Sequence, residues 1–485
     1  MSRPPLKNKC QLITYPNSLG GDLKRLVEVL PRHFGTALGG VHLLPFYPSS
    51  GDRGFAPLRY DEVDPQFGSW ADIDALGERY DLMVDFMLNH LSRQSPQFQD
   101  FQSKKDASPF AQLFIRLAQW VPPHGEIPAE QLSQIYTRKP RPPYTDVRFA
   151  DGSTERLWCT FDEEQVDLDL LHDTGRRFVS DTLKALVQHP IAMLRIDAFA
   201  YTTKKLGTRC FFEEPEVWDI LGHVRQTVAD QGVVLLPEVH EHHRYQLRLA
   251  EHGYWVYDFA LPMLALHALY EGTAARLRSW LEICPRQQFT TLDTHDGLPV
   301  VDVVDLLSDE EIEHTRETLF TRGANVKRRY NTSDYQNLDI YQINCTYYSA
   351  LGDDDDAYIT ARAIQFFTPG IPQVYYVGLL AGRNDIELVE RTRVGRDINR
   401  HDYTLAEIEA ECTRPVVQRL LKLMRWRNAH PAFDGDMQLL DAPDHILSVR
   451  WQTGGHEATL YADLRAHRSE ITHRQPGGEL QRFCP

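Results

Sequence analysis

The chain has 485 residues, of which 42% are hydrophobic and 25% charged, the composition of a globular protein with room for a large central domain and smaller ones. A formal net charge of −16 without a long basic run argues against nucleic acid as a partner. No stretch approaches the roughly 18 uninterrupted apolar residues of a membrane helix, so we expect a cytoplasmic protein with no membrane partner.

Eight short runs rich in Val, Ile, Leu and aromatic residues recur along the chain, each followed by a stretch with helical character. This alternation predicts parallel, buried strands, and eight of them predict a closed (β/α)8 TIM barrel of the α/β class. An open doubly wound sheet is the alternative, but the turn Tyr15-Pro-Asn-Ser-Leu-Gly-Gly21 lacks its G-x-G-x-x-G pattern. The predicted strands cover residues 10–15, 40–46, 82–89, 192–199, 233–240, 255–261, 289–295 and 373–377.

Two gaps between these strands far exceed the roughly 30 residues of a βα unit. The gap from His90 to Asp197 is proline-rich at 122–123 and 139–143, which predicts a small irregular domain over the barrel mouth after strand 3. The gap from Asp296 to Gln373 contains a polar, loop-like segment at 331–338, which predicts a second excursion after strand 7.

The C-terminal part changes character after an amphipathic helix expected around residues 416–428. Short runs at 446–451 and 458–461, separated by Thr453-Gly-Gly455, predict an antiparallel β domain. The predicted domains are the barrel in three parts (1–90, 171–297 and 354–432), insertion domain B (91–170), insertion domain B′ (298–353) and the C-terminal β domain (433–485).

The run Met193-Leu-Arg-Ile-Asp-Ala-Phe-Ala200 places Arg195 and Asp197 near the end of a predicted strand. Side chains at i and i+2 of a strand share a face, so the two should project together, and the guanidinium should keep Asp197 ionised. An ionised, positioned carboxylate is what covalent attack on a sugar requires. For an isolated Arg-x-Asp, an internal ion pair that holds a loop would be the preferred interpretation.

Three other predicted strands also end in polar residues: Asp85-Phe-Met-Leu-Asn-His90, Pro237-Glu-Val-His240 and Asp293-Thr-His-Asp296. Barrel active sites lie at the C-terminal ends of the strands, so these groups should converge on one pocket. Gathering three carboxylates there would be costly in a purely structural core. The pattern therefore predicts an active site.

Asp-x-x-x-Asn-His, Arg-x-Asp, a strand-end Glu and His-Asp, in this order, resemble the four signature regions of the α-amylase superfamily of retaining glycoside hydrolases and transglucosidases. Longer strings, among them Gly51-Asp-Arg-Gly-Phe55 and Gly395-Arg-Asp-Ile-Asn-Arg-His401, resemble the bacterial sucrose phosphorylases over nearly the whole chain. This resemblance implies a glycosyltransferase that reversibly transfers the α-glucosyl group of sucrose to phosphate. The products would be α-D-glucose 1-phosphate and fructose, formed with retention through a covalent β-glucosyl-enzyme and without a cofactor.

The resemblance also implies catalytic roles. Asp197 matches the nucleophile, Glu238 the acid/base, and Asp296 the third carboxylate that stabilises the oxocarbenium-like transition state; a retaining pair stands only about 5 to 5.5 Å apart. Arg195 would hold Asp197 charged. His90 and His295 match residues that hydrogen-bond the glucosyl hydroxyls.

Other matches concern substrate binding. Asp52 and Arg400 match a clamp on the far hydroxyls of glucose, although a turn and a surface ion pair are the alternatives. The resemblance implies substrate contacts for a further set of residues. They would form apolar walls, contact the covalent intermediate, or bind fructose or phosphate. The set comprises Phe55, Tyr136, Phe161, Gln165, His240, Asp339, Tyr341 and Gln342. Which of Arg138, Lys139 and Arg141 meets phosphate stays open.

Several alternatives remain at this point. Phosphorylases of sucrose 6-phosphate, glucosylglycerol or glucosylglycerate, or a plain hydrolase, would share the chemistry and differ in the leaving group or acceptor. A carbohydrate-binding barrel without catalysis would lack a carboxylate, and all three are present. In every case the expected partners are small molecules, here sucrose, phosphate, glucose 1-phosphate and fructose, and the protein is expected to be a monomer or homodimer.

A metal-dependent barrel hydrolase is a further alternative, because metal-ligand residue types stand at 90, 197, 240, 295 and 296. Arg195 argues against it, since a fixed cation beside Asp197 would repel a metal. The seven cysteines are scattered and include no Cys-x-x-Cys pair, so we predict reduced thiols rather than disulfides or a thiolate zinc site. No metal is predicted.

Overall fold

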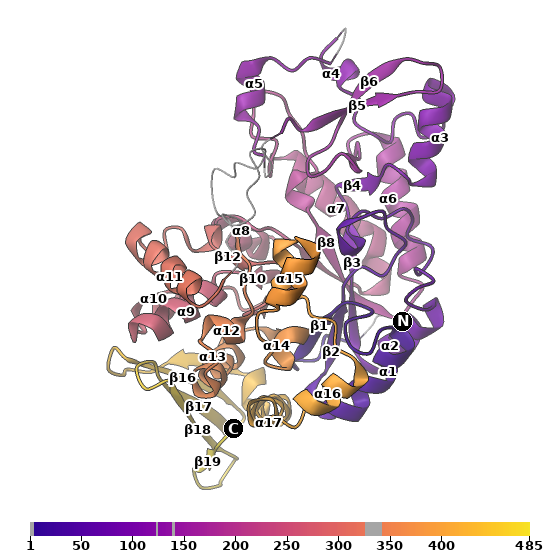
Figure 1. Cartoon of the computed structure of the whole chain (residues 1–485). Helices are drawn as coiled ribbons and strands as arrows, with labels where there is room; N and C mark the ends of the chain where they lie inside the picture. The colour runs from indigo at the N-terminus through magenta and orange to yellow at the C-terminus, as the bar shows by residue number, and fades with distance from the viewer. Residues whose placement is uncertain (1–3, 123–124, 138–140, 325–341) are drawn as a thin grey trace. The chain divides into compact units, whose positions relative to one another are not determined.

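The computed structural model describes residues 4–122, 125–137, 141–324 and 342–485 (Figure 1). These residues divide into two compact units. The first comprises the described parts of Met1–Pro5 and Leu43–Val239, and the second comprises the described parts of Leu6–His42, His240–Asn331 and Asp339–Pro485.

The first unit contains three parallel strands of the predicted set, β3 (Asp81–Met87), β8 (Ile191–Asp197) and β9 (Val234–Pro237). β8 pairs with β3 on one side and with β9 on the other. Their residues are almost all buried, as expected for a parallel sheet covered on both faces. The helices of this part of the unit are α2 (Trp70–Arg79), α6 (Asp173–Leu186) and α7 (Glu216–Val228).

The chain between β3 and α6 forms the predicted excursion, drawn in purple in Figure 1. It holds two small antiparallel sheets, one of β4 (His90–Ser92) with β7 (Gln165–Asp167) and one of β5 (Tyr144–Arg148) with β6 (Thr154–Trp158). Its own apolar cluster includes Leu117, Ile135 and Trp158. The helices here are α3 (Pro96–Lys104), α4 (Leu117–Trp120) and α5 (Ala129–Gln134).

The second unit contains four parallel strands that pair in the order β10, β11, β14 and β1. Their bounds are Val256–Asp258, Gln288–Thr290, Ile371–Tyr375 and Gln11–Thr14. β2 (Gly40–Leu43) lies where the two units meet in the sequence. The helices are α1 (Leu23–Val29), α8 (Arg244–Glu251), α9 (Leu261–Glu271), α10 (Ala275–Ile283), α11 (Asp309–Thr321), α12 (Tyr347–Ala350), α13 (Asp355–Phe367), α14 (Tyr376–Leu379), α15 (Ile386–Thr392), α16 (Leu405–Glu411) and α17 (Pro415–Ala429).

The end of the chain forms a five-stranded antiparallel sheet, yellow in Figure 1, as predicted. Its strands are β15 (Asp436–Leu439), β16 (Ile446–Thr453), β17 (His456–Asp463), β18 (Arg468–Arg474) and β19 (Gln481–Phe483). Gly454 and Gly455 both have positive φ, the conformation that a tight hairpin between β16 and β17 requires. The indole of Trp451 donates to the carbonyl oxygen of Phe367 at 2.8 Å and ties the sheet to α13.

All eight predicted strands are present, but most are shorter than the sequence pattern indicated. The largest error concerns residues 289–295, because β11 ends at Thr290. Beyond it, the Thr291 hydroxyl donates to the carbonyl oxygen of Asp293, and the chain continues irregularly through Asp296. His90 is likewise not at the end of β3; it starts β4.

None of the helices in the described ranges is both long enough and apolar enough to span a bilayer. The proposed boundaries of the inserted domains stay predictions.

Candidate active site

Asp197 and Glu238 lie side by side at the ends of two paired strands of the first unit. The parallel register of β8 and β9 sets Ile196 opposite Pro237, so the next residue on each strand is one of the two carboxylates. The Glu238 amide also donates to the carbonyl oxygen of Ile196 at 3.1 Å, which continues the pairing by one residue. The two side chains therefore reach the same edge of the sheet.

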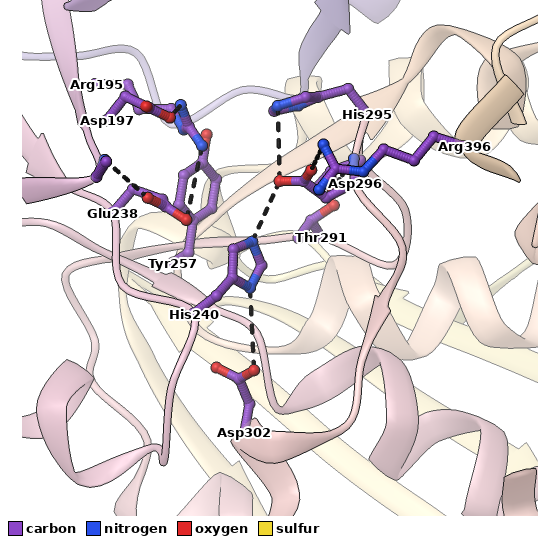
Figure 2. A network of polar contacts seen from close by, with 12 residues as sticks. Arg195, Asp197, Glu238, His240, Tyr257, Thr291, His295, Asp296, Asp302 and Arg396 are labelled. Carbon is purple, nitrogen blue, oxygen red and sulfur yellow. Dashed lines mark hydrogen bonds and ion pairs between the residues drawn. The ribbon is translucent and has the colours of Figure 1, made fainter. Parts of the chain in front are cut away.

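Arg195 is the cation that joins this group. Its Nη1 donates to Asp197 Oδ1 at 2.8 Å and also to Asp85 Oδ1, while its Nη2 lies 3.8 Å from Glu238 Oε1 (Figure 2). Asp85 stands directly opposite Arg195 in the β3–β8 register, which explains how a third carboxylate reaches the guanidinium. The predicted contact between Arg195 and Asp197 is present, and one cation faces three acids.

The presence of one cation among three acids changes the expected protonation state of Asp197. Burial is the largest influence and raises the pKa of Asp197; Arg195 lowers it, whereas Glu238 and Asp85 raise it, so that the pKa is about 8 against an ordinary 3.8. The expectation that Arg195 alone keeps Asp197 ionised is therefore wrong. The group of acids around Arg195 binds a proton readily near neutral pH.

Ala198 follows Asp197 in a left-handed backbone conformation, with φ of 54°. This conformation is strained for a residue with a Cβ atom and is concentrated at functional sites. It aims the Ala198 amide at Glu238, to whose Oε2 it donates at 3.2 Å. The strained turn thus helps to orient the carboxyl group of Glu238.

Four of the predicted sugar-binding residues form a second cluster in the same unit. His90 Nε2 and Gln165 Nε2 both donate to the carbonyl oxygen of Phe55 at 2.9 Å, and a carbonyl can only accept, so Nε2 of His90 carries a proton. The rings of His90 and Phe161 meet edge to face at 5.6 Å. The Arg195 guanidinium lies 5.9 Å from the centre of the Phe55 ring, which connects this cluster to the carboxylates.

Tyr136 belongs to an aromatic group next to this cluster. Its ring is parallel to that of Tyr201 at 6.3 Å, and Tyr201 in turn meets Phe161 edge to face at 4.9 Å. The Arg209 guanidinium lies 4.6 Å from the centre of the Tyr136 ring. The sequence pattern gave no signal for Tyr201 or Arg209.

Asp296 in the second unit has the opposite surroundings to Asp197. His240 Nε2 and His295 Nε2 lie 3.5 and 3.6 Å from its Oδ2, and Arg396 Nη1 lies 3.4 Å from its Oδ1 (Figure 2). Burial by itself raises the pKa of Asp296, but His295, Arg396 and His240 together lower it well below its ordinary value. The surroundings of Asp296 therefore favour its ionised form.

Arg400 is buried in the same unit and holds the backbone beside Asp296. Its Nε and Nη2 donate to the carbonyl oxygen of His295 at 3.1 and 2.8 Å, and its guanidinium lies 5.8 Å from the centre of the Tyr15 ring. The forked contact fixes the loop that carries His295 and Asp296. Asp293, three residues earlier, forms a buried ion pair with Arg362 at 2.8 Å and belongs to the core.

The remaining predicted residues are only partly described. Gln342 lies in β13 (Gln342–Ile343), which pairs antiparallel with β12 (Leu298–Pro299). The side chain of Asp52 lies outside the described part of the chain, although its backbone begins a short 3-10 turn. Four other residues lie outside the described ranges altogether: Arg138, Lys139, Asp339 and Tyr341.

Among the described residues, no three His, Cys, Asp or Glu side chains are grouped so that they could hold a metal ion. All seven cysteines are free thiols, and five of them are buried.

Comparison with known proteins gives concordant matches. Residues 11–281 match the model of the α-amylase catalytic domain. The sucrose phosphorylase of Streptococcus mutans is 51% identical over 96% of this chain and 98% of its own length, and the glucosylglycerol phosphorylase of Marinobacter adhaerens is 44% identical over 96% and 97%. The chain belongs to the α-amylase family.

Among solved structures, the crystal structure of sucrose 6F-phosphate phosphorylase from Thermoanaerobacter thermosaccharolyticum is 43% identical and covers 99% of both chains with a TM-score of 0.95. The predicted α-amylase-type barrel with a C-terminal antiparallel sheet is thereby confirmed. So are the predicted kinship with sucrose phosphorylases and the enzyme class, a phosphorylase-type glycosyltransferase of the α-amylase family.

Sequence reasoning did not single out three residues that contact Arg195 or the predicted catalytic carboxylates. Asp85 is the first residue of the Asp-x-x-x-Asn-His signature, and its position opposite Arg195 could have been found by aligning the two predicted strands. Arg396 lies in the string Gly395-Arg-Asp-Ile-Asn-Arg-His401, which was noted only for Arg400. Ala198 carries no signal, because its role depends on backbone conformation rather than on its side chain.

Proposed function

We propose that this chain is a sucrose phosphorylase that reversibly transfers the α-glucosyl group of sucrose to phosphate, giving α-D-glucose 1-phosphate and fructose with net retention. The observation that carries the proposal is the adjacency of Asp197 and Glu238 across the β8–β9 register, with Arg195 in contact with both. Two carboxyl groups on neighbouring strands suit a double displacement, in which one attacks the sugar and the other moves a proton.

In the first displacement, an oxygen of Asp197 attacks the anomeric carbon of the glucosyl group. The bond between that carbon and the fructosyl oxygen breaks, and Glu238 donates its proton to the leaving oxygen. The products are a β-glucosyl ester of Asp197, free fructose and ionised Glu238.

In the second displacement, a phosphate oxygen attacks the anomeric carbon and the ester bond to Asp197 breaks. Glu238 takes up the proton from the attacking phosphate, so both carboxyl groups return to their starting states. Two inversions at one carbon give retention of the α configuration.

The raised pKa of Asp197 is consistent with this division of labour, because burial and the neighbouring acids favour a bound proton in the cluster around Arg195. Attack requires that proton to lie on Glu238, and its transfer there from Asp197 leaves the total charge unchanged. Asp296, held ionised by three cationic groups, would bind sugar hydroxyls and stabilise positive charge on the ring in the transition state.

The other predicted residues would bind the two halves of the substrate. His90, Phe55, Phe161 and Gln165 already contact one another in one cluster, the arrangement expected of a sugar-binding wall. His295 and Arg400, with Asp52, would bind the glucosyl hydroxyls. Fructose or phosphate would meet the remaining predicted residues, Tyr136, His240, Asp339, Tyr341 and Gln342.

A second candidate is phosphorolysis of sucrose 6-phosphate, the activity named for a relative that is 44% identical over 99% of both chains. One observation favours it: Nη2 of Arg141 is buried, and no atom of the described residues accepts a hydrogen bond from it. A guanidinium there would suit the phosphate of the donor as well as the phosphate acceptor. The 51% identity to a named sucrose phosphorylase favours the unphosphorylated donor.

The test is to incubate the purified chain with inorganic phosphate and, in separate reactions, sucrose, sucrose 6-phosphate, glucosylglycerol or glucosylglycerate, and to quantify glucose 1-phosphate. We expect the highest kcat/KM with sucrose, unchanged in EDTA, and none for the Asp197→Asn variant. A higher kcat/KM with another donor would replace sucrose by that donor. Release of free glucose alone, with phosphate present, would contradict phosphorolysis.

A further inference from the structure

Asp302 is a buried acid that the proposed reaction does not use. It lies in a 3-10 turn between two valines, and its side chain is fully inaccessible to solvent. One of its oxygens, Oδ1, accepts a hydrogen bond of 2.9 Å from Gln246 Nε2 on α8, and Gln246 is buried as well. Burying an acid among apolar residues is costly, so a structural core would ordinarily carry an apolar residue at this position.

The second oxygen of Asp302 faces His240. His240 Nδ1 lies 4.0 Å from Asp302 Oδ2, while Nε2 of the same ring lies 3.5 Å from Asp296 Oδ2. Figure 2 shows the imidazole between the two carboxylates, with one ring nitrogen directed at each. The ring also stacks on Phe259, with centres 3.8 Å apart and planes within 20° of parallel, so it cannot tilt away.

We propose that Asp302 is a positioning residue for His240: its buried carboxylate faces Nδ1 and favours the positively charged imidazolium, which His240 presents to the phosphate acceptor. The proposal rests on the proposed function, in which His240 binds in the subsite of the leaving group and acceptor. Asp296 and Asp302 both face His240, and His295 and Arg396 contact Asp296 in turn. Two carboxylates on opposite sides of one imidazole favour a proton on each of its nitrogens.

A histidine beside a neutral acceptor needs no such partner, but an anionic acceptor such as phosphate gains from a fixed positive charge. The buried position of Asp302 strengthens its field at His240, because little water screens it. Asp302 therefore bears on the choice between phosphate and water as acceptor, since water carries no charge.

The same two segments contain a matched control. His242 and Asp305 form an equivalent pair, with Nε2 and Oδ2 2.8 Å apart, but the Asp305 side chain is 78% exposed. Asp305 lies three residues after Asp302, and Asp305→Asn removes a carboxylate from His242 rather than from His240.

The experiment compares Asp302→Asn with Asp305→Asn, measuring KM for inorganic phosphate in phosphorolysis and the rate of transfer to water without phosphate. For Asp302→Asn we expect KM for phosphate to rise about tenfold, because a buried negative charge 4.0 Å from the imidazole is lost, and the rate of hydrolysis to change by less than about twofold. Asp305→Asn should leave both values unchanged.

A double-mutant cycle with His240→Asn separates positioning from general damage. If Asp302 acts through His240, Asp302→Asn has no further effect on the phosphate KM in the His240→Asn background. Gln246→Met, which loosens Asp302 without removing its charge, gives the same test if Asp302→Asn does not fold. It should raise the phosphate KM by a smaller factor, and only when His240 is present.

Equal losses of phosphorolysis and hydrolysis, or an effect that persists without His240, would overturn the positioning role. A wild-type chain that forms no glucose 1-phosphate would overturn the proposed function and this inference together. Normal formation of glucose 1-phosphate with an unchanged phosphate KM in Asp302→Asn would overturn this inference alone.

Discussion

Asp197 and Asp296 are both nearly buried carboxyl groups, with side chains 15% and 12% exposed, yet their pKa values move in opposite directions. Around Asp197, three carboxyl groups share one arginine, and the pKa of Asp197 rises to about 8. Around Asp296, two histidines and an arginine surround a single carboxyl group, and the pKa of Asp296 falls well below its ordinary value. The number of opposite charges in reach, rather than the degree of burial, decides which carboxyl group holds a proton.

This difference matches the tasks proposed for the two units. The acid/base must give a proton to the leaving group and take one up from the acceptor in each cycle, so a cluster of acids that favours a bound proton is useful. A group that only stabilises positive charge on the sugar must never be protonated. The excess of acidic groups around Asp197 meets the first requirement, and the excess of basic groups around Asp296 meets the second.

The most severe change removes the nucleophile. Asp197→Asn should lower glucose 1-phosphate formation by roughly four orders of magnitude or more, because the amide cannot form the glucosyl ester. The control is Asp181→Asn, an exposed position on α6, which should retain full activity. A residual rate within about tenfold of wild type would mean that Asp197 does not form the covalent bond.

Glu238→Gln separates acid catalysis from the electrostatics of the pair. With sucrose, activity should fall by about 10²- to 10⁴-fold, since the leaving oxygen is no longer protonated. With α-glucosyl fluoride, whose leaving group needs no proton, the loss should be small.

The same variant tests the shared proton. Removing the negative charge of Glu238 lowers the pKa of Asp197, so the acid limb of kcat/KM for glucosyl fluoride should move to lower pH. An acid limb that stays in place, or moves to higher pH, would contradict the coupling of the two carboxyl groups.

Arg396→Gln weakens the cationic surroundings of Asp296 while leaving both histidines in place. The pKa of Asp296 should rise but remain below neutrality, because His295 and His240 still stabilise its charge. We expect a loss in kcat of less than about fivefold at pH 7, as for a partly exposed ion pair, and a larger loss toward pH 5. Arg396→Lys should restore most of the rate. A loss that is independent of pH would indicate a contact with substrate instead.

The smallest expected effect concerns His430, whose pKa is also set by burial and by the charged groups around it. Burial, with a further contribution from the neighbouring His473 and His456, lowers the pKa of His430 to about 4. The folded pKa lies below that of the unfolded chain, so stability is lost as the pH falls from about 6.5 toward 4. His430→Gln should reduce the drop in Tm between pH 7 and pH 5, whereas a variant of the exposed His252 should not. An identical drop in the His430 variant would exclude this cluster as a source of acid sensitivity.

Local patterns predicted the parts of the site that depend on local geometry. The eight strands were recognisable from apolar runs, and the contact of Arg195 with Asp197 follows from the alternation of side chains along β8. The adjacency of Asp197 and Glu238 follows from the pairing of consecutive barrel strands.

Features that depend on the register between strands or on irregular segments could not be predicted in this way. Asp85 contributes to the raised pKa of Asp197 from its position opposite Arg195, and no pattern within one strand reveals this pairing. Asp296 lies beyond the end of β11, and its partner Arg396 comes from a short turn a hundred residues later. The sequence pattern therefore identified the acids but not the charges that set their protonation.

The covalent role of Asp197 is tested most directly by trapping the intermediate. The Glu238→Gln variant is incubated with α-glucosyl fluoride, quenched in acid, digested and analysed by mass spectrometry. We predict one hexosyl group per chain, attached to the Asp197 carboxyl in the peptide that contains Met193–Ala200, and none in the double variant that also carries Asp197→Asn. An adduct on another residue, or turnover of the donor without any adduct under conditions that slow the second displacement, would contradict the mechanism.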